Sequence, residues 1–421
     1  MSSALLTDRY ELTMLQAALA SGKAERNCVF EVFTRNLPGG RRYGTLAGVG
    51  RVLEAVADFR FGEDELSYLR DRQIVDSRTL DFLAGYKFDG KIEGYAEGEL
   101  FFPGSPVLQV SGSFASAVLL ETVVLSILNY DSAVASAASR MVSVARGRTL
   151  VEMGARRAHE AAAVSAARAA YIAGFDSTSN LEAGRSWDIP TMGTSAHSFT
   201  LLHDTEREAF EAQIASQGKK TTLLVDTYDI AAAVELAVEL TGGEIAAVRI
   251  DSGDLAQVAE TVRNQLDRLG ATETKIVVTS DLDEYTIAAL GSAPVDRYGV
   301  GTSLVTGSGH PTVGFVYKLV AHESDSRWID VAKKSVGKES LGGKKVASRE
   351  VRNSVAQAEW LGSDSGRQLQ SVIWDGGADA ELLGPAGVRR AREHHKMAIS
   401  ELPAAGLRLS KGEPAIPTIY S

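Results

Sequence analysis

The chain has 421 residues, of which 44% are hydrophobic and 23% are charged, and its formal net charge at pH 7 is -10. This length exceeds the roughly 250–300 residues that one hydrophobic core usually serves, so two domains are expected. The acidic balance argues against a nucleic-acid-binding protein, which would carry a basic face. Cys28 is the single cysteine, which excludes an intrachain disulfide and a zinc site built from cysteines. The chain shows no apolar run of about 18 residues or more and no signal-peptide pattern, so we expect no membrane contact and a cytoplasmic location.

The N-terminal region combines helical patterns with short strands. Residues 5–21 are predicted to form a helix because their leucines recur at helical spacing, with Thr7 as the cap and Gly22 as the stop signal. A strand is expected at 28–34, followed by a loop rich in glycine and arginine at 35–42. This mixture is typical of an α+β domain.

From about residue 149 onward, short apolar strands alternate with helical segments. Strands are expected at 149–152, 223–225, 246–250, 275–279 and 298–300, and helices at 156–173, 229–240, 255–268 and 283–290. Strands that alternate with helices of about 10–15 residues indicate βαβ units and a parallel sheet. Polar, charged or glycine residues follow each strand, as at the mouth of an α/β barrel, where active sites lie. The pattern therefore predicts an irregular α/β barrel.

One histidine stands among small polar residues in this region. Residues 193–199 read Gly-Thr-Ser-Ala-His-Ser-Phe, follow an apparent strand at 189–192, and place His197 at a strand end. An imidazole can accept a proton or a phosphoryl group near neutral pH, so His197 is a candidate catalytic residue. The alternative is a histidine that only fills a hydrogen-bonded loop.

Arg249 and Asp251 stand at the end of the strand expected at 246–250, and their spacing points both side chains to the same face. An arginine can clamp a planar carboxylate with two hydrogen bonds, and an aspartate can hold ribose hydroxyls or the waters of Mg²⁺. The alternative is an ion pair between the two residues. Asp254 is better explained as a helix cap.

Two other segments predict anion binding. Gly299, Gly301 and Thr302 follow a strand and offer close backbone approach and a hydroxyl donor, which is the form of a barrel phosphate site. A plain tight turn would give the same pattern. Arg156 and Arg157 are expected to open a helix directly after a glycine, where cations oppose the helix dipole unless an anion balances them.

Six motifs in chain order resemble the nicotinate phosphoribosyltransferase family. They are Thr7–Met14, Arg35–Pro38, Gly174–Asn180, Gly193–Phe199, Val248–Leu255 and Gly299–Val305. The resemblance covers residue 6 to about residue 350 and implies a type II phosphoribosyltransferase: an α/β-barrel domain at 131–320, and an α+β domain at 1–130 that 321–421 complete. It also implies a homodimer with shared active sites. The implied reaction joins nicotinate and 5-phosphoribosyl 1-pyrophosphate to give nicotinate mononucleotide and pyrophosphate, with ATP hydrolysis, in NAD salvage.

The resemblance assigns a role to several positions. His197 matches the family's phosphorylatable histidine, Arg249 matches the arginine near base and ribose, and Tyr10 matches the ring that stacks on the pyridine from the partner subunit. The loop around the nucleotide phosphate is Gly299, Gly301 and Thr302. The other assigned positions are Asp251 in catalysis and Arg140, Met153, Arg156, Thr178, Asn180 and Ser198 in substrate binding.

The implied small molecules are Mg²⁺ as cofactor, whose ligands the sequence does not identify, and ATP as co-substrate. Met153 stands where many family members have Phe, and Ala137 stands where many have Lys. An arginine-rich pocket suits the carboxylate of nicotinate, and Ser179 and Asn180 offer no acid that would bind an amide. Nicotinate is therefore the expected base. The alternatives are a nicotinamide-using transferase, a non-catalytic nucleotide-binding relative, and another barrel enzyme that acts on phosphorylated sugars.

Overall fold

The computed structural model describes residues 3–333, 341–363 and 366–421. By the contacts between Cα atoms, the chain forms two compact units, one of Met1–Ser136 with His310–Ser421 and one of Ala137–Gly309. The functional division expected near residues 130 and 320 stays a prediction. No helix among the described residues is long and apolar enough to cross a bilayer.

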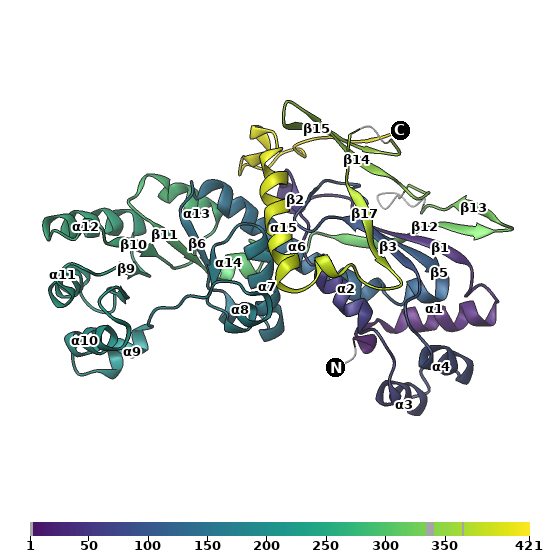
Figure 1. Ribbon diagram of the computed structural model, residues 1–421, viewed down its shortest axis with the longest axis horizontal. Coiled ribbons are helices and arrows are strands. Elements are labelled where there is room, and N and C mark those ends of the chain that lie inside the picture. Colours follow the sequence, from purple (N-terminus) through teal and green to yellow (C-terminus); the bar gives the residue numbers. More distant parts are fainter. Residues whose placement is uncertain (1–2, 334–340, 364–365) are drawn as a thin grey trace. The chain divides into compact units, whose positions relative to one another are not determined.

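The unit of Ala137–Gly309 is built on one parallel sheet (Figure 1). Its strands are β6 (Thr149–Glu152), β7 (Ser177–Thr178), β8 (Thr222–Leu224), β9 (Ala247–Ile250), β10 (Lys275–Val278) and β11 (Arg297–Val300). They follow the order β7-β6-β11-β10-β9-β8, and every neighbouring pair is parallel. The sheet curls into a half-barrel with β7 and β8 at its edges, which confirms the mixed α/β class.

Helices follow the strands of this sheet as the alternating pattern predicts. They are α7 (Glu160–Ile172), α8 (Leu181–Trp187), α9 (His197–Leu202), α10 (Glu206–Gln217), α11 (Ile230–Thr241), α12 (Leu255–Arg268), α13 (Glu284–Ala289) and α14 (Thr302–Val305). Asp254 caps α12 by accepting a hydrogen bond from the backbone N–H of Gln257, as expected. The strands are short and apolar, with side chains such as Leu150, Val248 and Ile276 fully or almost fully buried. Their polar residues therefore gather at the carboxyl edge.

Three local predictions were wrong. Arg156 and Arg157 do not open a helix but lie in a 3₁₀ turn (Ala155–Arg157), and α7 begins three residues later, which keeps both cations off its positive end. The apparent strand at 189–192 makes only a single bridge, between Thr178 and Thr191, because Pro190 has no N–H to donate. The first long helix is shorter than expected.

That helix, α1, spans Arg9–Ala20, and its N-cap is Asp8 rather than Thr7. The Thr7 hydroxyl donates instead to the carboxylate of Glu11. The expected strand at 28–34 is confirmed as β1 (Asn27–Thr34).

The other unit holds a six-stranded antiparallel sheet, of order β13-β12-β1-β5-β3-β17. Besides β1, its strands are β3 (Lys91–Tyr95), β5 (Leu108–Ser113), β12 (Phe315–Ser324), β13 (Arg327–Asp330) and β17 (Gln370–Asp375). Strands from the C-terminal part thus pair directly with β1 and β3, so the two ends of the chain share one core.

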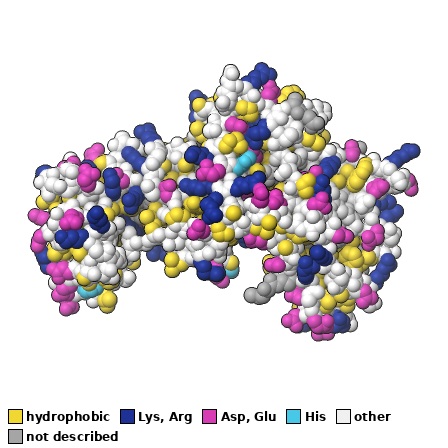
Figure 2. Space-filling view, in the orientation of Figure 1, with side chains coloured by type: hydrophobic (Ala, Val, Ile, Leu, Met, Phe, Trp, Pro, Cys, Tyr) yellow, Lys and Arg dark blue, Asp and Glu magenta, His cyan; other side chains and the backbone are white. Residues whose placement is uncertain are grey.

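Smaller elements complete this unit. They are the sheet β16 (Arg367–Gln368), β14 (Ala347–Arg352), β15 (Val355–Leu361) and β18 (Thr418–Tyr420), the pair β2 (Gly44–Thr45) and β4 (Leu100–Phe101), and the helices α2 (Val49–Ala57), α3 (Glu63–Asp71), α4 (Ser77–Ala84), α5 (Phe114–Val118) and α15 (Gly384–Ser400). The long helix α6 (Glu121–Val144) contains the boundary between the units. On the face shown in Figure 2, cationic and anionic side chains are interspersed, so this face has no continuous basic stripe.

Candidate active site

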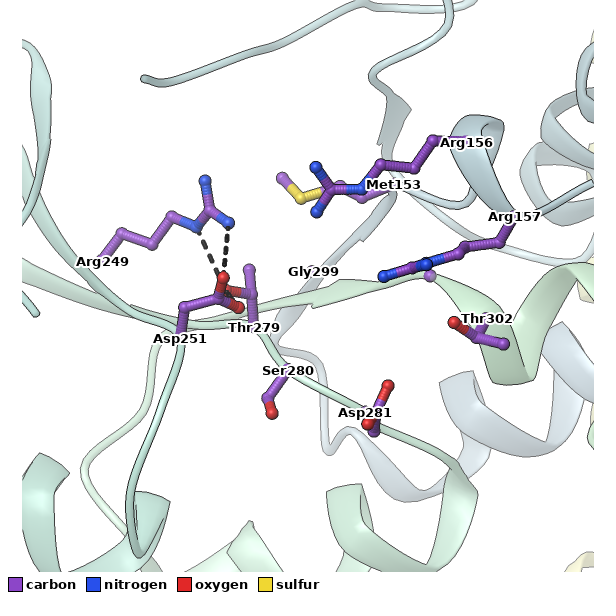
Figure 3. A pocket seen from close by; sticks show the side chains of 11 residues that line it. Met153, Arg156, Arg157, Arg249, Asp251, Thr279, Ser280, Asp281, Gly299 and Thr302 are labelled. Atoms are coloured by element: carbon purple, nitrogen blue, oxygen red, sulfur yellow. Dashed lines mark hydrogen bonds and ion pairs between the residues drawn. The ribbon is translucent and has the colours of Figure 1, made fainter. Parts of the chain in front are cut away.

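Two cavities open at the carboxyl ends of the parallel strands. The first has a volume of about 210 Å³ and the second of about 310 Å³, and both are lined by Met153, Arg156, Arg249 and Asp251. Figure 3 shows how residues of β9 and β11, and of the segments that follow β6, β9, β10 and β11, converge on the first cavity. Because four residues belong to both walls, the cavities form one site with two lobes.

Arg249 is fixed at the junction of the lobes. Its Nε donates to Thr279 Oγ1 (3.1 Å), and its Nη1 donates to Thr194 Oγ1 (3.0 Å) and to the Ser195 carbonyl (3.2 Å). Its Nη2 forms an ion pair with Asp251 Oδ2 (3.3 Å), and Asp251 Oδ1 accepts from Thr279 Oγ1 (2.5 Å). The expected alternative, an ion pair, is therefore present. The same bonds orient a guanidinium that lines both lobes, which is preorganisation for an anionic ligand.

His197 is the first residue of α9 and lines the second lobe. Its Nδ1 lies 3.1 Å from Thr227 Oγ1, and its Nε2 lies 3.9 Å from Asp226 Oδ1 and 4.0 Å from Asp251 Oδ2. The imidazole is 41% exposed, so a ligand in the lobe can reach Nε2. A hydroxyl partner on one nitrogen and carboxylates near the other define the ring's orientation, and the catalytic role of His197 stays a prediction.

Asp226 is almost completely buried, with a side chain 1% exposed. Its Oδ2 accepts from the backbone N–H of Asp251 (2.9 Å) and from Ser252 Oγ (2.7 Å). Its Oδ1 has no hydrogen-bond partner among the described residues. An unsatisfied buried carboxylate oxygen is costly, and a protonated imidazole or a cation beside it would offset that cost.

The first lobe carries the features of an anion site. Arg156 and Arg157 line it from one side, and Gly299, Gly301 and Thr302 line it from β11 and the start of α14 (Figure 3). A Cβ at Gly299 would lie 2.6 Å from Thr279 Cγ2 and 2.7 Å from Met153 Sδ, so only glycine fits there. Three cations in all face this lobe, counting Arg249.

Four of the residues expected to bind substrate line neither lobe. The Thr178 hydroxyl donates to Glu152 Oε2 (2.5 Å) and is fully buried, while Asn180 caps α8 by accepting from the Ala183 N–H (2.9 Å). Arg140 is 5% exposed and pairs with the buried carboxylate of Glu284 (3.1 Å). Ser198 is exposed on α9. Their expected roles stay predictions.

Tyr10 belongs to the other unit, on α1, where its side chain is 45% exposed. Partial burial, with the nearby carboxylates of Glu121, Glu11 and Asp8, raises the pKa of Tyr10 to about 12. The phenol is therefore neutral at physiological pH and presents an aromatic ring to solvent or to a partner.

Comparison with known proteins decides the family. A model of the nicotinate phosphoribosyltransferase (NAPRTase) family matches residues 149–359, and a model of the NAPRTase N-terminal domain matches residues 5–129. The chain belongs to the nicotinate phosphoribosyltransferase family.

Relatives named nicotinate phosphoribosyltransferase are similar to this family member over most of its length. Nicotinate phosphoribosyltransferase pncB1 of Mycobacterium tuberculosis is 54% identical over 98% of this chain and 94% of its own. Nicotinate phosphoribosyltransferase of Bacillus subtilis is 38% identical over 82% of this chain and 73% of its own. The crystal structure of human nicotinic acid phosphoribosyltransferase superposes with a TM-score of 0.84 at 25% identity, over 99% of this chain and 97% of that one.

The NAPRTase site also contains residues for which the sequence analysis predicted no role. Asp226 and Thr227 follow β8, and Thr279, which joins Arg249 to Asp251, follows β10. Asp226 and Thr227 come after the strand expected at 223–225 and Thr279 ends the strand expected at 275–279, so their place at a strand end was the available signal. Their contacts join strands 28 to 30 residues apart in the sequence, and such pairs cannot be identified from local patterns.

Proposed function

We propose that this NAPRTase transfers the phosphoribosyl group of 5-phosphoribosyl 1-pyrophosphate to nicotinate. The observation that carries the proposal is the pair of lobes that share Met153, Arg156, Arg249 and Asp251. Such a site can hold an anionic base and a polyanionic sugar phosphate against each other. The pyridine nitrogen attacks C1 of the ribose, the C1–O bond breaks, and pyrophosphate leaves with the bonding electron pair.

The arginines and carboxylates have distinct tasks in this reaction. Oxocarbenium character develops at C1 as the bond breaks, and the cations that line the lobes hold the anionic groups of both substrates around C1. We assign the 5-phosphate to the Gly299–Thr302 side of the first lobe, with Arg157, and the nicotinate carboxylate to Arg249 and Arg156. No strong base is needed, because the pyridine nitrogen is already a nucleophile.

Magnesium fits the site as a companion of the substrate. No group of three or more His, Cys, Asp or Glu side chains in the described part of the chain is arranged to hold a metal ion. Asp251 and Asp281 nevertheless line the first lobe beside the arginines. Mg²⁺ usually binds through one or two carboxylates together with substrate phosphates. We propose that Asp251 and Asp281 would hold Mg²⁺ together with the phosphates of phosphoribosyl pyrophosphate, where the ion would supply positive charge beside the leaving group.

His197 is proposed to couple ATP to the transfer. With its N–H on Nδ1 and bonded to Thr227, the imidazole leaves Nε2 free as a nucleophile. Attack of Nε2 on the γ-phosphorus of ATP forms an N–P bond and releases ADP, and water later cleaves the phosphohistidine to phosphate. The polar loop of 193–197 lines the lobe in which this exchange would take place.

We also propose a homodimer with shared sites, in line with the family. Large apolar side chains are exposed on the barrel unit near the carboxyl edge, at Leu201 (61%), Leu202 (78%) and Tyr228 (60%). Leu6 (65%) and Tyr10 (45%) are exposed on the other unit. A dimer interface that covered these side chains would remove their apolar surface from water. A cytoplasmic location remains part of the proposal.

The test is to incubate the protein with nicotinate, Mg²⁺ and phosphoribosyl pyrophosphate, with and without ATP. We expect nicotinate mononucleotide and pyrophosphate in equal amounts, formed faster with ATP. Product only with nicotinamide would assign the chain to amide-using transferases. Binding of nicotinate without any product would favour a non-catalytic relative, and turnover of other sugar phosphates alone would favour the remaining alternative.

A further inference from the structure

Glu152, the last residue of β6, is a buried carboxyl group that the proposed chemistry does not use. Its side chain is fully buried, and it forms no ion pair with Lys, Arg or His in the described ranges. Its Oε1 accepts from the Gly154 N–H and its Oε2 accepts from the Thr178 hydroxyl, both at 2.5 Å. Burial raises the pKa of Glu152. A buried carboxyl group is costly unless it is hydrogen-bonded, so these two bonds determine what Glu152 does in the fold.

The two hydrogen bonds of Glu152 form a bridge between Gly154 and Thr178. At its Gly154 end, the bridge holds the turn after β6. Gly154 is wedged there: a Cβ on it would lie 2.3 Å from Val305 Cγ1 and 3.0 Å from the Gly301 carbonyl. Its own carbonyl accepts from the Arg157 N–H (2.8 Å). This turn carries Met153 and Arg156, which line both lobes.

The other end fixes the wall of the second lobe. Thr178 Oγ1 accepts from the Asn180 N–H (2.9 Å) while it donates to Glu152. The Ser179 N–H donates to the backbone carbonyl of Glu152 (2.8 Å), and Ser179 lines the second lobe. A single carboxylate therefore connects the turns that follow β6 and β7.

We propose that Glu152 is a positioning residue for both substrates. It lines neither lobe and touches no ligand; it sets the distance between the Arg156 turn and the Ser179 wall. This inference rests on the proposed function, because a change in that distance affects KM only if the substrates bind in these lobes.

Glu152→Gln is the most informative substitution, because it removes one hydrogen-bond acceptor and keeps the size of the side chain. Both carboxylate oxygens of Glu152 accept, and the backbone N–H of Gly154 can only donate. A glutamine has one acceptor oxygen, so in Glu152→Gln either Gly154 or Thr178 loses its acceptor, although the side chain keeps its size. Thr178→Val breaks the same bridge from the other side, and Thr178→Ser preserves it.

The experiment measures KM and kcat for nicotinate and for phosphoribosyl pyrophosphate in the wild type and these variants. We expect Glu152→Gln and Thr178→Val each to raise KM for both substrates on the order of tenfold, because a displaced Arg156 binds both less well. The double variant should be no worse than the worse single one, since both changes break one bridge. Thr178→Ser keeps the hydroxyl and should raise KM less than Thr178→Val does. Glu160→Gln is the unchanged control, because its side chain is 89% exposed on α7, and it should keep the wild-type KM values.

The outcomes separate the two proposals. A wild type without transferase activity refutes the proposed function. An active wild type in which Glu152→Gln changes neither KM refutes the positioning role. A loss of kcat alone refutes it too, because a merely structural defect reduces the amount of folded enzyme and leaves KM unchanged. Independent, additive losses in the double variant would also contradict the shared bridge.

Discussion

At the scale of single residues, the imidazole of His197 is oriented by three neighbours in the turns that follow β8 and β9. Thr227 occupies Nδ1, and the carboxylates of Asp226 and Asp251 lie within 4.0 Å of Nε2. The arrangement suits a residue that alternates between a free and a phosphorylated form.

His197→Ala should therefore abolish the stimulation by ATP and leave slow, ATP-independent formation of nicotinate mononucleotide. The reason is that the phosphoryl acceptor is lost while both lobes keep Arg156 and Arg249. Initial rates with and without ATP measure this. His159→Asn is the control, because His159 is 72% exposed and asparagine preserves the cap of α7. Full ATP stimulation in His197→Ala would exclude the phosphohistidine.

Some contacts between residues of this site could be predicted from the sequence, and others could not. Arg249 and Asp251 lie two positions apart on one strand, so their convergence follows from the alternation of side chains. Glu152 and Thr178 are 26 positions apart and meet only through the parallel register that pairs them in β6 and β7. No local pattern contains that register. The bond between Thr178 and Glu152 was therefore not predictable, whereas the bond by which Asn180 caps α8 spans only three residues and follows a local pattern.

At the scale of elements, a buried ionic cluster connects β14 with β15 and with segments near β4. Arg349 pairs with Glu99 (2.7 Å) and Glu359 (2.6 Å), and Arg367 pairs with Glu99 (2.6 Å) and Glu401 (2.7 Å). Arg349 and Glu359 are each at most 1% exposed. Arg349 and Glu99 lie 250 positions apart in the sequence. No local sequence pattern predicts their ion pair, just as none predicts the pairing of β1 with β12.

Arg349→Met should lower the free energy of unfolding by about 3–5 kcal/mol, because it leaves two buried carboxylates short of a cation. Arg352→Met is the matched control, with a 74% exposed arginine paired to Glu350 and an expected loss of about 0–1 kcal/mol. Urea unfolding followed by tryptophan fluorescence reports mainly on this unit, which holds three of the four tryptophans. Equal midpoints for the two variants would show that the cluster contributes little.

His395 of α15 predicts a pH dependence in the same region. It is buried, its Nδ1 faces the Gly98 carbonyl at 3.0 Å, and burial lowers its pKa to about 4. The folded state thus disfavours the proton that the unfolded chain binds below about pH 6.5. Its contribution to stability is complete above that pH and is lost as the pH falls toward 4.

Between pH 7 and pH 5, this residue should therefore cost the wild type about 2 kcal/mol of unfolding free energy. His395→Gln should be less stable at pH 7 yet show a flatter dependence over that range. Unfolding midpoints measured at several pH values compare the two slopes. Parallel slopes would mean that His395 does not titrate in this window.

At the scale of the whole molecule, the family relation predicts that neither subunit completes a site alone. Tyr10 and Arg249 belong to different units of the chain. If Tyr10 serves the partner's base pocket, subunit exchange between inactive Tyr10→Ala and inactive Arg249→Ala protein should restore about a quarter of the wild-type sites, those with both residues intact. Verified mixed dimers without activity would place both residues in the same subunit's site or leave Tyr10 structural.

We propose that the arginines at the carboxyl edge of the half-barrel select nicotinate, and a competition assay between nicotinate and nicotinamide measures that selection. The uncharged amide would lose the charge-assisted hydrogen bonds to Arg249, worth roughly 1.5–3 kcal/mol, so the acid should exceed the amide by at least about tenfold in kcat/KM. Arg249→Ala should lose most nicotinate activity while its melting curve stays near that of the wild type. Comparable use of nicotinate and nicotinamide by the wild type would contradict the assignment.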